Sequence, residues 1–255
     1  MNLHRRLSPE AHTAAIRPAT HAAVFDWTPW LRQIERKRRL LGRLCSPVWQ
    51  APVAWLAKFT AVSFRLDGMD VTEEQVALAA AVVRSPRRFR SRLSQRLRNH
   101  LAILRSIQRM LLRGVALRGS YVVRWYTSIS CGLSTTSLDD MAMDRIETVV
   151  GRLGSPRLRL QSAVQDISQL HSQLIADPLV PSFNGILARL LLFYHLGRCG
   201  LPPVMFDAVA DQPVLHDQQK LLPRLMSLID SSFDVMLADA TPTLAEAQIH
   251  LPKAI

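Results

Sequence analysis

The polar residues best placed to do chemistry lie between residues 171 and 189. His171 and Asp177 could each serve as a general base, because either side chain can take a proton from an acceptor group. A structural role competes for both. A buried imidazole is normally a hydrogen-bonded part of a fold, and an aspartate before a proline often caps a turn. Asn184, Gly185 and Arg189 follow at the start of an apolar run.

Residues 174–192 read LIADPLVPSFNGILARLLL and resemble the signature of Fic-domain (Fic/DOC) proteins, which is close to FxxIHPFxDGNGRxxRLLL. The two align without a gap, and Asn184, Gly185, Arg189 and the three leucines after it match. The resemblance implies transfer of a nucleoside monophosphate to a protein hydroxyl, with a histidine as base and an acidic residue holding magnesium.

Three positions of this signature depart from the family pattern. Pro178 stands at the catalytic histidine, and it has neither a titratable atom nor a backbone N–H. Ser182 replaces the metal-binding acidic residue, although a neutral hydroxyl is a poor ligand for a hard cation. Ile186 replaces the first arginine, and Phe183 replaces a glycine, which predicts the loss of a backbone conformation with positive φ. We therefore predict a Fic-like scaffold without transferase activity, and no cofactor or metal site.

An alternative keeps the chemistry with rearranged residues. In that interpretation the chain is an AMP-transferring enzyme that uses ATP and magnesium, and His171 or Asp177 is the base.

A second resemblance lies at residues 63–72, SFRLDGMDVT, which are similar to the SSxIEGxxxT segment of Fic proteins with an N-terminal inhibitory helix. In that family a glutamate of the segment pairs with the last arginine of the signature, in the place of a nucleotide γ-phosphate. Here the resemblance implies that Asp67, between Ser63 and Gly68, pairs with Arg189. Residues 200–203, GLPP, match the family's AGLPP ending, so the resemblance covers roughly residues 25–207.

The fold class predicted is mainly all-α, a Fic-like helical bundle with a small β-hairpin flap and an N-terminal helical extension. Only 10 glycines and long stretches rich in Leu, Ala, Arg and Gln favour helices. The strand formers of residues 118–132 predict the flap, which in the family aligns the target peptide. Expected regions are a loose leader (1–24), a helical region with the inhibitory-like segment (25–83), the core (84–240) and a tail (241–255). Helices are expected at 29–44, 51–59, 72–83, 87–112, 139–153, 159–175, 185–199 and 222–237. Residues 72–75, TEEQ, form a capping-box pattern that predicts the start of the third of these helices.

Charge adds another function class. The formal net charge of the 255 residues is +12, which favours contact with polyanions. Residues 84–98, RSPRRFRSRLSQRLR, contain seven arginines and no acidic residue, so a stripe including Arg87, Arg88 and Arg90 could contact nucleic acid without sequence preference. The competing interpretation is a solvated helix face.

The remaining patterns predict a cytoplasmic protein. The longest apolar stretch, 186–196, is shorter than the ~20 residues of a membrane span, and the three cysteines have no zinc or disulfide spacing. The main functional expectation is a catalytically inactive regulatory protein that binds a protein partner in a groove beneath the 121–132 flap. The resemblance also allows a homodimer.

Overall fold

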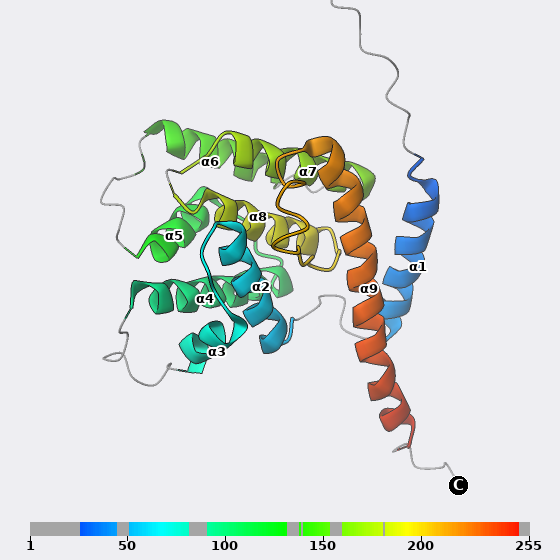
Figure 1. The fold of residues 1–255 in the computed structure, drawn as a ribbon. Helices are drawn as coiled ribbons and strands as arrows, with labels where there is room; N and C mark the ends of the chain where they lie inside the picture. The colour runs from blue at the N-terminus through cyan, green and yellow to red at the C-terminus, as the bar shows by residue number, and fades with distance from the viewer. Residues whose placement is uncertain are drawn as a thin grey trace, which may run out of the picture.

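The structure is a computed structural model that describes residues 26–44, 51–81, 91–131, 138, 140–153, 160–180 and 182–249. Within these ranges it contains helices and no strand, which confirms the all-α prediction (Figure 1). The helices are α1 (Thr28–Leu44), α2 (Val53–Leu66), α3 (Glu73–Ala81), α4 (Arg92–Leu112), α5 (Gly119–Ser130), α6 (Asp140–Leu153), α7 (Leu160–Ala176), α8 (Asn184–Arg198) and α9 (Gln218–Ile249).

Helix α8 forms the centre of the bundle. Every residue from 186 to 196 is buried, so the helix has no solvent-facing side. A helix that is apolar on all sides is stable only when other elements surround it. Helices α2, α4, α5 and α7 all pack against α8, and Figure 1 shows it in the middle of the molecule.

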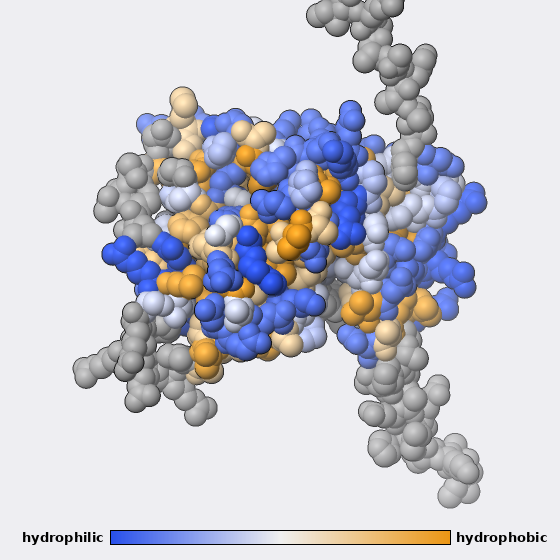
Figure 2. All heavy atoms as spheres, in the orientation of Figure 1, coloured by the Kyte–Doolittle hydropathy of each residue, from blue (hydrophilic) through white to orange (hydrophobic). Residues whose placement is uncertain are grey.

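Helices α1 and α9 form a pair beside this bundle, and α9 also packs on α7 (Figure 1). The indole nitrogen of Trp30 donates to the carbonyl oxygen of Met226 at 3.3 Å. Lys37 pairs with Asp230 at 2.7 Å and with Asp234 at 2.6 Å. A hydrogen bond and two ion pairs therefore join the N-terminal helix to α9. The outer surface around α1 is mostly hydrophilic (Figure 2).

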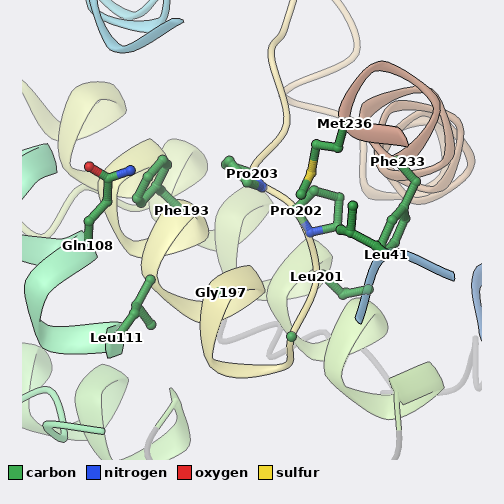
Figure 3. Close-up of a pocket in the computed structure, with 11 residues that line it drawn as sticks. Leu41, Gln108, Leu111, Phe193, Gly197, Leu201, Pro202, Pro203, Phe233 and Met236 are labelled. Carbon is green, nitrogen blue, oxygen red and sulfur yellow. The ribbon is translucent and has the colours of Figure 1, made fainter. Parts of the chain in front are cut away.

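A cavity of about 40 Å³ lies where this helix pair meets the bundle (Figure 3). Leu41 of α1 and Phe233 of α9 line it on one side, and Leu111 of α4 and Gly197 of α8 line it on the other. A side chain on Gly197 would collide with Leu111, so the glycine permits the close approach of α8 to α4. The cavity has room for a few water molecules.

The start of α3 agrees with the capping box that the sequence predicts. The backbone N–H of Gln75 donates to the Thr72 hydroxyl at 3.3 Å, and the Gln75 side-chain oxygen accepts from the Thr72 N–H at 3.0 Å. The last helix begins earlier than expected, at Gln218, because the Asp217 carboxylate accepts from the N–H groups of Gln219 and Lys220.

The predicted β-hairpin flap is wrong. Residues 119–130 form α5, whose buried side chains are Val122, Trp125, Tyr126 and Ile129. Their spacing of three, one and three residues is that of one helix face. Burial of this face against α4 and α8 outweighs the strand propensity of the individual residues.

Several sequence predictions concern residues outside the described ranges. These include the leader at 1–24, Cys45, and the arginines Arg87, Arg88 and Arg90. Cys131 and Cys199 are free thiols and are half-buried. Among the helices of the described ranges, none has the combination of length and apolarity that crossing a bilayer requires.

Candidate functional site

The N-terminus of α8 holds a carboxylate from another part of the chain. Asp67, directly after α2, forms an ion pair with Arg189, one turn into α8. Its second oxygen accepts from the backbone N–H of Ile186 at 3.3 Å. Arg189 also donates to the carbonyl oxygen of Ser63 at 2.6 Å and is only 2% exposed. The positive end of a helix and a guanidinium thus bind one anionic group.

Two glycines allow Asp67 to reach this position. Gly68, at φ +78°, ends α2 in the left-handed region, and its N–H donates to the Arg65 carbonyl oxygen at 2.9 Å. Gly185 lies in the first turn of α8, where a β-carbon would collide with the Asp67 carboxylate. A side chain at Gly185 would therefore exclude the anion from the helix N-terminus.

Arg189 needs Asp67 as a counterion because its guanidinium is buried. Desolvation lowers the pKa of the Arg189 guanidinium, and the charge and hydrogen bond of Asp67 oppose that shift. An arginine keeps its charge in proteins, so the pair is a buried ion pair. Removal of either partner would leave an uncompensated charge, which is far more costly than removal of both.

Asn184 braces the loop that precedes α8. Its amide nitrogen donates to the carbonyl oxygen of Leu174 at the end of α7, and its side-chain oxygen accepts from the N–H of Leu179 at 2.9 Å. One side chain therefore ties both ends of this turn together. Asn184 is a structural support here, because both hydrogen bonds are to the chain's own backbone.

Phe183 adopts the conformation that its side chain was predicted to prevent. Its φ is +59°, in the left-handed region, immediately before α8. That conformation costs a non-glycine residue about 1–2 kcal/mol. The guanidinium of Arg96 lies 4.7 Å from the Phe183 ring centre, and this cation–π contact fixes the aromatic side chain against α4. The loop keeps a glycine-like turn even without the glycine.

The three substituted signature positions lie in different environments. Pro178 and Ser182 are exposed, whereas Ile186 is completely buried. A buried isoleucine belongs to the core and offers no group to a phosphate. The residues at this place do not fit magnesium and a triphosphate. Ser182 stands where a carboxylate would hold the metal, and Asp67 already occupies the helix N-terminus. In the described part of the chain no cluster of three or more metal-ligating side chains is found.

The two candidate bases do not form a joint site. His171 on α7 is 1% exposed, stacks near Phe206 with ring centres 6.1 Å apart, and has no hydrogen-bond partner among the described residues. Asp177 is exposed, and its carboxylate pairs with Arg145 of α6 at 2.7 Å. His171 is therefore enclosed by the core, and Asp177 is held in an ion pair at the surface.

Two neutral histidines are buried near Arg189. Burial, together with the nearby charges of Arg189 and His216, lowers the pKa of His171 to about 3. Burial and the Arg189 charge lower the pKa of His100 to about 3. The Thr60 hydroxyl lies 2.9 Å from Nδ1 of His100. Both imidazoles are therefore uncharged at neutral pH, and the buried positive charge of Arg189 favours that state.

Of the residues predicted from the sequence, the structure brings together Ser63, Asp67, Gly68, Gly185 and Arg189. Asn184 was predicted as a remnant of a nucleotide loop, and in the structure its side chain hydrogen-bonds to the backbone of Leu174 and Leu179. The pairing of Arg96 with Phe183 was not expected, because no sequence spacing links residues so far apart. The arginines Arg87, Arg88 and Arg90 lie outside the described residues.

We expect Gly185 and Asp67 to be energetically coupled. Gly185→Ala should destabilise the protein because the new methyl group collides with the Asp67 carboxylate. In an Asp67→Ala background the same substitution should be neutral or should add up to about 1 kcal/mol of helix propensity. Urea unfolding of the four variants gives the coupling energy, which we expect to exceed roughly 1 kcal/mol. Additive effects would contradict the close packing of these residues.

Stability should fall in mild acid because His100 and His171 are buried in the neutral form. Between pH 6.5 and 3 the unfolded chain protonates both imidazoles while the folded protein leaves them neutral, so the free energy of unfolding decreases as the pH falls. Each histidine contributes up to roughly 1.4 kcal/mol per pH unit. Urea unfolding at several pH values should show a shallower slope for His171→Leu. The unmodified chain is the reference, and equal slopes in the two proteins would count against this explanation.

Comparisons with known proteins give the fold. No family model matches this chain, and no curated protein matches it. A similar solved structure is that of a Fic-domain-containing signaling protein from Bacteroides thetaiotaomicron, with 15% sequence identity and a TM-score of 0.64. The similarity covers 82% of this chain and 97% of that one. At this identity the likeness establishes architecture and not activity. The chain has a Fic-like fold.

Proposed function

We propose that this chain is a catalytically inactive Fic-like protein that acts by binding a protein partner. The observation that carries the proposal is the occupation of the α8 N-terminus by Asp67 and Arg189. An external phosphate would have to displace a carboxylate that already has both the helix N-terminus and a guanidinium as partners. The same displacement would leave the Asp67 carboxylate without these partners.

The chemistry of the loop supports the same proposal. A positioned general base contributes about 10²–10⁴-fold to a proton-transfer step, and Pro178 cannot supply one. Ser182 supplies no negative charge for a divalent cation. Ile186 lies in the core, so the phosphate contact of the family's first arginine has no counterpart at this position. The three substitutions therefore remove three separate requirements of the reaction, namely the general base, the metal ligand and the contact to the phosphate.

The alternative of a rearranged enzyme depends on His171 or Asp177. A base must come within hydrogen-bond reach of the proton that it removes. The burial of His171 keeps substrate from its ring, and the Asp177 carboxylate is already paired with Arg145. These surroundings favour the binding protein over the rearranged transferase.

We expect no nucleotide transfer and no nucleotide binding. The purified chain, incubated with labelled ATP, GTP, UTP or CDP-choline, magnesium and a cell lysate, should label no protein. Calorimetry with ATP and magnesium should show no heat of binding. Asp67→Asn should behave in the same way, because removing the negative charge from the helix N-terminus restores neither a base nor a metal ligand.

The controls separate the candidate functions. An active Fic enzyme in the same lysate must give labelling. Transfer by this chain that disappears in His171→Ala or Asp177→Ala would overturn the proposal in favour of the rearranged enzyme. Transfer that both variants retain would also overturn it, because the chain would then use a base elsewhere.

A further inference from the structure

The middle of this chain contains a long segment with many positive charges and no negative charge. Residues 84–138 contain twelve arginines, no lysine and no acidic residue. Their formal charge is therefore equal to the net charge of the whole chain, +12, and the rest of the sequence is balanced. The described part of this segment consists mainly of α4 and α5, which pack against each other (Figure 1). A uniform excess of arginine along the chain would not produce this distribution.

A groove of about 370 Å³ runs between these two helices. Small side chains leave space along it, namely Ala102 and Ser106 on α4 and Ser128 on α5. The amide nitrogen of Asn99 donates to the carbonyl oxygen of Ser128 at 2.6 Å and joins one helix to the other within the groove. The separation of the two walls is thus set by the fold, so a ligand would meet a preformed site.

Each wall of the groove carries an exposed guanidinium, Arg109 on α4 and Arg124 on α5. Neither guanidinium is in an ion pair within the described ranges, and no acidic residue lines the groove. Planar guanidiniums bind carboxylates through two parallel hydrogen bonds, which gives geometric selectivity as well as charge attraction. Two such groups facing one narrow hollow fit neighbouring acidic side chains.

We infer that the α4–α5 groove is the docking site for an acidic segment of a partner protein. This inference rests on the proposed binding function and names the surface that performs it. The groove favours a peptide over nucleic acid for two reasons. Trp125 is only 3% exposed, so its ring offers no face on which bases of a single strand could stack. A duplex is contacted by elements that project into its grooves, whereas this site is a hollow.

Fluorescence anisotropy with a labelled glutamate-rich peptide tests the inference at ~50 mM salt, where charge contacts are least screened. The full chain should bind this peptide, and Arg109→Glu/Arg124→Glu should weaken binding roughly tenfold or more. The matched control is Arg36→Glu/Arg43→Glu on α1, which changes the net charge equally at exposed positions away from the groove. The control should bind nearly as well as the unmodified chain.

Ala102→Gln adds a variant that fills the groove without changing charge. It should also weaken peptide binding, and circular dichroism must show that each variant is folded. If the charge-reversed variant does not fold, the Ala102→Gln result decides. Absence of peptide binding, or equal losses in the groove and control variants, would overturn the inference. Tighter binding of a labelled duplex DNA at the same groove would also overturn it, because the surface would then serve nucleic acid.

These results are separable from the test of the proposed function. Loss of peptide binding in the groove variants says nothing about nucleotide transfer. Any such transfer would take place at the α8 N-terminus, outside the groove. Conversely, nucleotide transfer by this chain would overturn the proposed function. Peptide binding in the groove would then be a contact of an enzyme with its substrate or regulator.

Discussion

The buried ion pair between Asp67 and Arg189 is the interaction on which the rest of the site depends. Arg189 lies on the most enclosed helix of the molecule, and its charge cannot be hydrated there. The desolvation cost of such a charge is several kcal/mol, so it persists only with a partner of opposite sign and further hydrogen bonds. Asp67, the Ser63 carbonyl oxygen and the N-terminus of α8 together meet that requirement.

That requirement links segments that are distant in the chain. Asp67 can reach Arg189 only if α2 ends at Gly68, if Gly185 has no side chain, and if the loop before α8 keeps its path. Asn184 and Phe183 maintain the loop, one by hydrogen bonds and the other by its left-handed backbone and contact with Arg96. The features that resemble a nucleotide site therefore have a sufficient structural explanation within this chain.

Arg189 and the arginines of the α4–α5 groove lie in different environments. Near Arg189 two imidazoles are held neutral, and the one interior anion of the site is already paired. The unpaired guanidiniums of the α4–α5 groove instead face solvent. An external acidic group can bind the second set without removing an internal partner, whereas at the α8 N-terminus it would compete with Asp67. This difference is the physical basis for placing partner binding on the surface.

Much of the fold and part of the site could be predicted from sequence. Helical periodicity located the described helices other than α5, and the capping box located the start of α3. The order of the two motifs implied the pairing of Asp67 with Arg189. Prediction failed where residue type and position disagreed. The strand formers of 119–130 became a helix, and Phe183 kept a positive φ, because tertiary contacts outweighed local preferences of about 1 kcal/mol.

The sequence by itself therefore determined the mainly helical architecture, the distribution of charge and the absence of a histidine, a carboxylate and an arginine from the signature positions. These are properties of residue type and local spacing. Only the tertiary structure decided that Ile186 and His171 are enclosed, that Asn184 braces a loop, and that Arg109 and Arg124 face one groove. Burial and proximity depend on which helices pack together, and sequence separation does not specify that packing.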